Sequence, residues 1–436
     1  MLEDRQKAPP ASPRPERTWE LPASTALWVA LWVAALAVAV QGFVRMLTRP
    51  LADRLPDLHV YVTAVSSFVH GTSLYGLHGS LRSGFTYPPF AGLVLLPLAA
   101  VPEAVSRVAW TALTILAAGG IALIVARALP RRLGPVAAVV PALTALVLAS
   151  KPLQSNLRFG QVSIFLTLAV LADAIALDGH RWQGVLTGLA AAIKLTPLLF
   201  IPYLWLIGRR RAAALAGGTF AVASAVGFAI LPHDSAAFWG TYLWHESHGL
   251  PLAEGGNQSI YGVLLRAGAH GAALGLLWAG LIAAVGALGL WRAREAWLGG
   301  QRLFSLAVVG CVSILVSPIS WTHHQLWILL AAAGVFTANA SVDVVIAALI
   351  VLLMVVGLPG IAGAGTAGRW LAVNERAALA AAVACGLPFV AAGRRSLPTR
   401  SWRSDAGCPA RRRPAPQRRV DIPPGPTSGP AGGRGS

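Results

Sequence analysis

The stretch LFSLAVVGCVSILV (303–316), followed directly by SPISWTHHQLW (317–327), contains the pattern that decides the fold. The first segment has no charged side chain. The second is a polar turn in which two adjacent histidines lie between tryptophans, and the chain then becomes apolar again. Apolar runs separated by short polar turns are typical of helices that cross a membrane. The pattern predicts repeated crossings and raises the question of why two histidines lie at such a turn.

The composition of the whole chain supports the same interpretation. Of its 436 residues, 56% are hydrophobic and 12% are charged. Soluble globular domains carry about 25% charged residues, so this chain has roughly half the usual share. We therefore predict an all-α polytopic membrane protein, with about twelve transmembrane helices joined by loops and interfacial helices.

The net charge of +18 is almost entirely due to arginine, because Lys7, Lys151 and Lys194 are the only lysines. The arginines lie between apolar runs and near the C-terminus, as the positive-inside rule predicts. They are not spread as on a nucleic-acid-binding surface, so no nucleic-acid partner is expected.

The three cysteines lie far apart in the sequence, at Cys311, Cys385 and Cys408. This spacing fits neither a disulfide framework nor a zinc site. We assign no cofactor and no metal-ligating residue. The first apolar run is long enough to span a membrane and no cleavage-site pattern follows it, so no cleavable signal peptide is expected.

Three regions follow from the distribution of apolar residues. Residues 1–22 and 394–436 are polar and rich in proline or arginine, so we expect two disordered cytoplasmic tails. Residues 23–393 form the expected transmembrane domain. The segment 260–291 is too long for one crossing and predicts a short interfacial helix, 260–268, before the true span. The expected spans are 24–46, 87–104, 106–127, 134–150, 161–178, 183–207, 212–231, 260–291, 303–317, 325–338, 342–359 and 376–393.

The orientation of the chain can be predicted from its basic clusters. If the N-terminus is cytoplasmic and the spans alternate, GRRR (208–211) and WRAREAW (291–297) fall inside, as the positive-inside rule requires. RALPRR (127–132) falls outside, against the rule. The polar and aromatic-rich segments all fall on the outer side, where we expect the protein to act. These segments are 47–86, 232–259 and 318–324.

Asp57 is the candidate catalytic residue, in LPDLHVY (55–61) shortly after the first span. One interpretation is a helix N-cap beside Pro56. The other is a carboxylate near the membrane interface, whose reduced solvation raises its pKa so that it accepts a proton from a nucleophile. Asp53 lies four residues earlier and is the natural comparison.

Two charged residues, Asp173 and Lys194, lie inside expected spans at similar depths. Buried charges are costly in lipid, so they are usually paired or functional. The two residues either pair across neighbouring helices, or Lys194 meets an anionic phosphate of a lipid ligand. Pro197 is expected to distort the helix beside Lys194.

His323 and His324 project in directions about 100° apart if they are helical, so they are not expected to hold one metal ion. They are either interfacial residues among tryptophans or contacts to a substrate phosphate. The remaining candidates for substrate contact are polar side chains at span boundaries or on the expected interfacial helix. They are Tyr87, Gln161, Asn257, Gln258 and Arg266.

Six segments, in order, resemble the sequence pattern of glycosyltransferase family 87, over about residues 25–340 and more weakly to 393. The chain departs from that pattern at SKPLQSNLRFGQ (150–161), where Glu-Pro-Val is more usual, and at Tyr261, often arginine in the family. The segments are DLHVYVTAVSSFVHGTSLYG (57–76), FTYPPFAGLVLLPLAAVP (85–102), GQVSIFLTLAVLAD (160–173), GVLTGLAAAIKLTPLLF (184–200), NQSIYGVLLR (257–266) and SPISWTHHQLW (317–327).

The resemblance implies a membrane fold of the GT-C type, an extracytoplasmic active site and a polyprenyl-phosphate-mannose donor, as in mycobacteria and related actinobacteria. It implies α-(1→2)-mannosyl transfer, with inversion, to a mannosylated glycolipid or envelope glycan such as a phosphatidylinositol mannoside or lipomannan. It places the catalytic base at Asp57 and the residue near the donor phosphate at His323 or His324. Lys194, Gln161, Asn257 and Arg266 match motif positions whose roles are less defined.

Two other functions remain compatible with the sequence. The first is transfer of another polyprenyl-phosphate-linked sugar, such as arabinose, to an envelope glycan. The second is membrane transport, for which charges at the midplane such as Asp173 and Lys194 are typical.

Overall fold

The computed structural model describes residues 25–76, 84–129, 135–244, 251–335, 341–358 and 365–387. The chain divides into two units, residues 1–393 and 394–436. The tails expected at 1–22 and 394–436, together with Cys408, lie outside the described residues.

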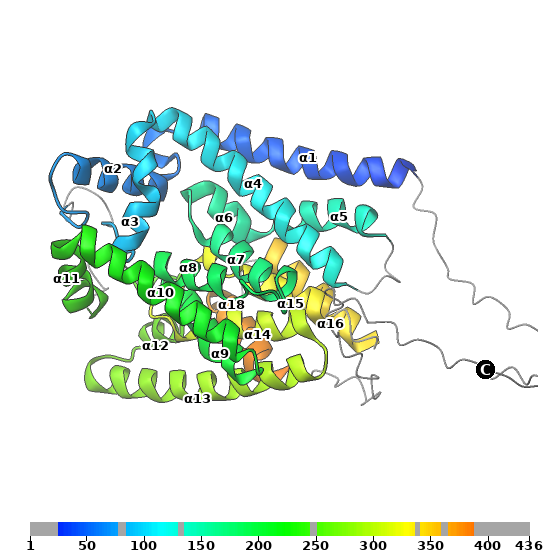
Figure 1. Cartoon of the computed structure of the whole chain (residues 1–436). Helices are drawn as coiled ribbons and strands as arrows, with labels where there is room; N and C mark the ends of the chain where they lie inside the picture. The colour runs from blue at the N-terminus through cyan, green and yellow to red at the C-terminus, as the bar shows by residue number, and fades with distance from the viewer. Residues whose placement is uncertain are drawn as a thin grey trace, which may run out of the picture. The chain divides into compact units, whose positions relative to one another are not determined.

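The regular structure of the described residues is entirely helical, which confirms the all-α prediction (Figure 1). The first helices are α1 (Thr25–Thr48), α2 (Pro56–Val69), α3 (Pro89–Leu95), α4 (Glu103–Ala128), α5 (Val136–Ala149), α6 (Lys151–Phe159), α7 (Ser163–Leu171), α8 (Val185–Ile193) and α9 (Phe200–Leu206). The others are α10 (Arg210–Ile230), α11 (Pro232–Gly240), α12 (Ile260–Arg266), α13 (Gly271–Leu298), α14 (Arg302–Val316), α15 (Leu326–Val335), α16 (Ser341–Val355), α17 (Thr366–Val373) and α18 (Glu375–Ala381).

Four described helices, α1, α4, α10 and α13, are long and apolar enough to cross a membrane. The successive helices α5 and α6 meet at an angle of 64° and form a fifth candidate if they make one bent span. Long apolar side chains on α1 and α13 are exposed, as expected for lipid-facing helices. The structure therefore has the character of an all-α membrane protein, whereas the count of about twelve spans is not confirmed.

The count differs because several expected spans are interrupted. The span expected at 161–178 is α7 followed by the π-helical turn Ala172–Ala176. The span expected at 183–207 is α8, an extended residue at Lys194, a 3₁₀ turn and α9. Pro197 lies in that 3₁₀ turn, where a ring without an N–H cannot continue a helix. By contrast, the predicted division of 260–291 is confirmed, because α12 and α13 are separate helices.

The apolar stretch 303–316 forms a deeply buried helix, α14. Every residue of α14 from Leu303 to Leu315 is buried, and α14 packs against α13, α15 and α18. Close packing requires glycine at the α14–α15 contact, where a Cβ atom on Gly310 would lie 2.1 Å from the Trp327 ring. The polar turn after α14 is therefore carried on a rigid support.

A second close contact positions the N-terminal end of α2. Gly160 ends α6 with φ of +74°, and a Cβ atom there would lie 2.7 Å from Cβ of Leu58. Glycine adopts positive φ without steric cost and leaves room for the neighbouring helix. As a result, the turn between α6 and α7 lies directly against the first turn of α2, which contains Asp57.

Candidate active site

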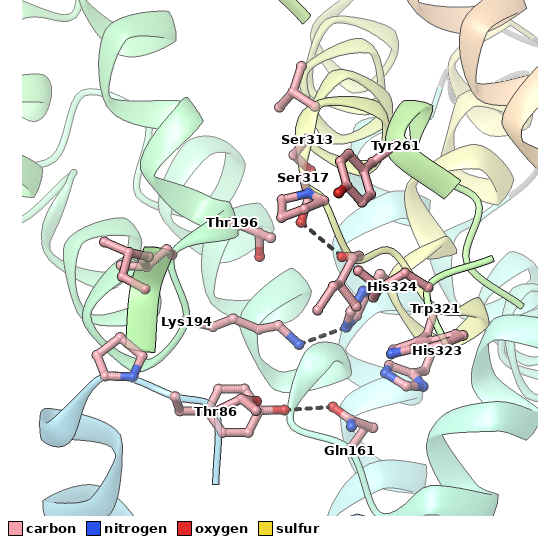
Figure 2. Close-up of a pocket in the computed structure, with 18 of the residues that line it drawn as sticks. Thr86, Gln161, Lys194, Thr196, Tyr261, Ser313, Ser317, Trp321, His323 and His324 are labelled. Carbon is pink, nitrogen blue, oxygen red and sulfur yellow. Dashed lines mark hydrogen bonds between the residues drawn. The ribbon is translucent and has the colours of Figure 1, made fainter. Parts of the chain in front are cut away.

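One cavity of about 660 Å³ brings together residues that are distant in the sequence (Figure 2). Its walls come from α2, the segment before α3, the α6–α7 turn, the break after α8 and the polar turn after α14. Six of the residues predicted from the sequence line it: Asp57, Tyr87, Gln161, Lys194, His323 and His324.

A directed chain of hydrogen bonds holds the Asp57 carboxylate. Nε2 of Gln161 donates to Oδ2 of Asp57, and Oε1 of the same amide accepts from the Tyr87 hydroxyl at 3.0 Å. The Tyr61 and Tyr87 hydroxyls lie 2.8 Å apart. Because Tyr87 donates to Gln161, Tyr61 donates to Tyr87, and the orientation of the amide is fixed by its two neighbours.

The pKa of Asp57 is raised to about 6, primarily because burial disfavours the charged form. The hydrogen bond from Gln161 and the positive charge of Lys194 both act in the opposite direction. Burial also raises the pKa of Tyr87, so its hydroxyl remains a hydrogen-bond donor at neutral pH. Asp57 is thus ionised at pH 7, with a proton affinity suited to general base catalysis.

Lys194 also lines the cavity, and its charge acts on the Asp57 carboxylate. Its Nζ is 2.7 Å from Nε2 of His324 and 5.0 Å from the centre of the Tyr87 ring. A protonated lysine only donates, so Nε2 of His324 accepts and the imidazole proton resides on Nδ1. Tyr87 therefore contacts both charged groups of the site, the carboxylate through Gln161 and the ammonium through its ring.

The two histidines are neutral, and His323 is buried whereas His324 is partly buried. Their rings meet edge to face, with centres 4.4 Å apart. Burial and the nearby Lys194 charge lower the pKa of both residues well below the ordinary value, and His323 further lowers that of His324. Among the described residues, no partner is bonded to Nε2 of His323 or Nδ1 of His324. Buried polar groups of this kind are costly unless a ligand or an ordered water satisfies them.

Neighbouring residues hold the histidine turn in place. Nδ2 of Asn156 donates to the His323 carbonyl at 3.0 Å, and the Ser155 hydroxyl is 3.4 Å from His323 Nδ1. On the other side, Arg376 Nη1 donates to the Thr322 hydroxyl at 3.2 Å. The turn is therefore fixed by α6 and by α18, far away in the sequence.

Three predicted substrate contacts, Asn257, Gln258 and Arg266, lie outside the cavity and form hydrogen bonds to other groups of the protein. Asn257 donates to the Leu252 and Pro318 carbonyls and accepts from Ser320 N–H. These three side chains brace the polar turn and α18 and are not among the residues that line the cavity. Gln258 bonds to the Val373 carbonyl and the Ala377 N–H, and Arg266 bonds to Asn374 and the Glu254 carbonyl.

Asp173 and Lys194, two charged residues inside expected spans, do not pair with each other. The Asp173 carboxylate accepts hydrogen bonds from Gly184 N–H, Leu186 N–H and the Thr187 hydroxyl, all at the start of α8. A carboxylate is favoured there by the unpaired N–H groups of a helix N-terminus. Asp173 is thus held by α8, whereas Lys194 at the other end of α8 faces the cavity.

Asp53, the residue compared with Asp57 in the sequence, lies exposed in a separate 3₁₀ turn.

Sequence reasoning missed several residues of the site. Tyr61 lies four positions after Asp57, a spacing that places both on one helix face and offered a usable signal. Trp321 and Thr196 also line the cavity. Arg376 and Ser155 act across helices, and only the packed structure shows their contacts. Within the described residues, no group of three or more His, Cys, Asp or Glu side chains could hold a metal ion.

Comparison with known proteins places the chain in a family. The sequence model of glycosyltransferase family 87 matches residues 85–318, more than half of the chain. This chain belongs to glycosyltransferase family 87. The matched segment of this family 87 member contains Gln161 and Lys194 and ends shortly before the histidines. No solved structure matches the chain significantly.

Curated relatives extend the match. A polyprenol-phosphate-mannose-dependent α-(1-2)-phosphatidylinositol pentamannoside mannosyltransferase of Mycobacterium tuberculosis is 35% identical over 292 residues, which is 64% of this chain and 65% of the relative. A phosphatidylinositol mannoside mannosyltransferase of the same organism is 30% identical over 63% of this chain and 68% of its own length. The family 87 member therefore spans slightly less than two thirds of the first relative.

The hydrogen bond from Gln161 generates a prediction about pH. If Asp57 acts as a base, the transfer rate rises with pH through about 6, because only the carboxylate accepts a proton. Gln161→Leu removes an interaction that favours the carboxylate, so the acid limb of the pH–rate profile moves to higher pH. The neutral histidines add no second limb between pH 5 and 8. The measurement is the profile of initial rates for parent and variant. A variant with lower rates but an unmoved limb would contradict this role for Gln161.

Proposed function

We propose that this protein transfers mannose from polyprenyl-phosphate-mannose to a mannosylated glycolipid acceptor, with inversion and formation of an α-(1→2) linkage. The observation that carries the proposal is the cavity, which a carboxylate with a pKa of about 6, a lysine and two neutral imidazoles line together. The names of the relatives supply the sugar, the linkage and the lipid donor. The acceptor is a phosphatidylinositol mannoside or a related envelope glycan.

The proposed base is Asp57. Gln161 occupies Oδ2 of the carboxylate and leaves Oδ1 for the hydroxyl of the acceptor sugar. Asp57 takes the hydroxyl proton while the acceptor oxygen forms a bond to the anomeric carbon of the mannose. A positioned base of this type contributes about 10²- to 10⁴-fold to a rate.

The leaving group is the phosphate of the lipid donor. The bond between the anomeric carbon and the phosphate oxygen breaks, and its electron pair remains on the phosphate. Lys194 and the unpaired Nδ1–H of His324 provide a charge and a hydrogen-bond donor where this negative charge develops. Attack opposite the phosphate converts a β-linked donor sugar to an α-linked product.

The proposed reaction takes place on the extracytoplasmic side of a bacterial plasma membrane, within a fold of the GT-C type. The support is the positive-inside pattern, with GRRR (208–211) and WRAREAW (291–297) on the cytoplasmic side. In that orientation, the end of α1 and the start of α2, including Asp57, lie on the outer side.

Two alternatives are less well supported. Transfer of another polyprenyl-phosphate-linked sugar would use the same base and the same phosphate contacts, and only the sugar subsite would differ. A transporter would favour a pair of charges between helices near the midplane. The bonding of Asp173 to α8 removes that pair.

The role of Asp57 is tested by Asp57→Asn. Asparagine keeps the size and the ability to accept from Gln161 but cannot act as a base. We expect a folded protein whose transfer rate falls by about 10²-fold or more. Asp53→Asn loses a charge in the same segment and is expected to retain activity. The assay measures radiolabelled mannose transferred from polyprenyl-phosphate-mannose to glycolipid in proteoliposomes. Parental turnover by Asp57→Asn would exclude the proposed mechanism.

The role of Lys194 is tested by Lys194→Gln, which removes the charge opposite the leaving phosphate. We expect a decrease in kcat of about 10²- to 10³-fold, the range for removing one group that stabilises developing charge. Lys151→Gln makes the same chemical change outside the cavity and serves as the control. Equal effects of both substitutions would assign Lys194 a structural role.

The orientation is tested by cysteine labelling in a variant without its native cysteines. Thr72 follows α2 and is exposed, and Arg210 is exposed at the start of α10. A membrane-impermeant maleimide added to intact cells is expected to label Thr72→Cys and to label Arg210→Cys only after the membrane is opened. The reverse order would place the cavity on the cytoplasmic side.

A further inference from the structure

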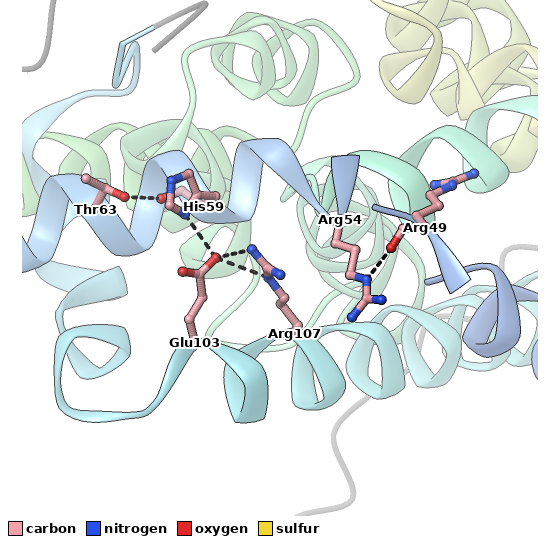
Figure 3. A network of polar contacts seen from close by, with 6 residues as sticks. All are labelled: Arg49, Arg54, His59, Thr63, Glu103 and Arg107. Atoms are coloured by element: carbon pink, nitrogen blue, oxygen red, sulfur yellow. Dashed lines mark hydrogen bonds and ion pairs between the residues drawn. The ribbon is translucent and has the colours of Figure 1, made fainter. Parts of the chain in front are cut away.

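Four arginines gather where α1, the segment before α2 and the end of α6 meet. They are Arg45, Arg49, Arg54 and Arg158. Arg45 Nη1 donates to Gln154 Oε1 on α6 at 3.0 Å, and Arg54 Nε donates to the Arg49 carbonyl (Figure 3). We call these four residues the arginine cluster.

The arginine cluster has no ion-pair partner among the described residues. No described carboxylate lies within 4.0 Å of these guanidinium groups. Burial, and after it the positive charges of Arg158 and Arg45, lowers the pKa of Arg49, whereas the charge of Asp53 acts in the opposite direction. Arg107 provides a contrast in the same view, because Glu103 lies 2.6 Å from its Nη2 (Figure 3). Like charges held together without a counter-ion favour binding of an anion.

The position of the cluster connects it to the cavity. Arg54 precedes Asp57 by three residues, so their Cα atoms are at most about 11 Å apart. Arg158 lies over the Phe159 ring at 5.1 Å, and that ring in turn lies 6.0 Å from the His323 ring. The arginine cluster therefore lies next to the elements that carry Asp57 and the histidine turn.

The cluster also lies at the end of a candidate membrane span. Arg45 is in the last turn of α1, and Arg49 follows directly after it. The end of a membrane span lies at the level of the lipid headgroups, where arginine side chains extend toward water. If α1 runs outward, the cluster lies on the outer side, where the positive-inside rule disfavours arginine. In that orientation, the positive-inside rule does not explain why four arginines gather here.

We propose that the arginine cluster binds the phosphodiester of the acceptor lipid and thereby places the acceptor's terminal sugar at Asp57. This inference rests on the proposed function and extends it to the acceptor. A phosphoinositide headgroup carries its phosphate at the interface and its sugars beyond it, so one molecule spans both places. Guanidinium groups are suited to phosphate because they donate pairs of hydrogen bonds.

The experiment uses the full-length protein in vesicles of phosphatidylcholine, with radiolabelled polyprenyl-phosphate-mannose at a fixed concentration. The double variant Arg49→Gln/Arg158→Gln is compared with the parent. Neither side chain is bonded to another side chain in the described structure, and thermal unfolding checks that the variant folds. Arg210→Gln is the matched control, because Arg210 also lies over an aromatic ring, that of Trp205.

Two acceptors are assayed, a phosphatidylinositol mannoside and a neutral alkyl α-mannoside with the same terminal sugar. We expect KM for the phosphoinositide acceptor to rise about tenfold or more in the double variant, the size expected for loss of charge-assisted contacts. Kinetics with the neutral acceptor and kinetics of Arg210→Gln should be unchanged. Failure of the parent to use either acceptor would contradict the proposed function, not this inference alone.

Three results would overturn the inference. Equal losses with both acceptors would show a structural role for the arginines, and no loss with either would show that they bind nothing relevant to transfer. The third concerns the source of the phosphate. If the double variant differs from the parent only when phosphatidylglycerol is added to the vesicles, whatever the acceptor, the cluster binds bulk anionic lipid. Inorganic phosphate is included as a competitor and is expected to inhibit the parent with the phosphoinositide acceptor more than the double variant.

Discussion

The contact between Gly160 and the first turn of α2 is the constraint on which the site depends. Without a side chain at this position, the α6–α7 turn reaches the backbone around Leu58, and the next residue, Gln161, reaches Asp57. One amide then joins the carboxylate to a tyrosine pair. The same turn ends α6, the helix that bonds to the histidine turn. The contact between Gly160 and α2 thus fixes the position of the Asp57 carboxylate relative to the histidine turn.

The electrostatics of the cavity follow from this arrangement. Among the described residues that line it, only Asp57 and Lys194 carry charge, because both histidines are neutral. In the proposed reaction, a proton reaches Asp57 while a second negative charge appears on the phosphate. The total charge in the cavity stays constant and moves toward Lys194. As Asp57 is neutralised, the ammonium no longer stabilises the carboxylate and acts on the leaving group alone.

The sequence predicted the class of fold and the main charged residues of the site. Long apolar runs such as α1 and α13 have a clear signal, and polar residues inside apolar segments stand out because burying them is costly. The number of spans was not predictable in the same way. Breaks such as the extended backbone at Lys194 depend on Pro197 and on packing with neighbouring helices. Asn257, Gln258 and Arg266 looked like ligand contacts, but their bonding to distant backbone groups depends on where α17 and α18 lie.

The bonding of Asp173 has a further consequence for how the molecule responds to change. Helix α8 is held at one end by this carboxylate and carries Lys194 just beyond the other, about 15 Å away at helical rise. Near the first end, Asp178 joins Arg209 and Arg302 at 2.7 and 2.6 Å. Helix α8 therefore connects the position of Asp173 rigidly to that of Lys194. A change that weakens the hydrogen bonds of Asp173 would therefore displace Lys194 without touching the cavity itself.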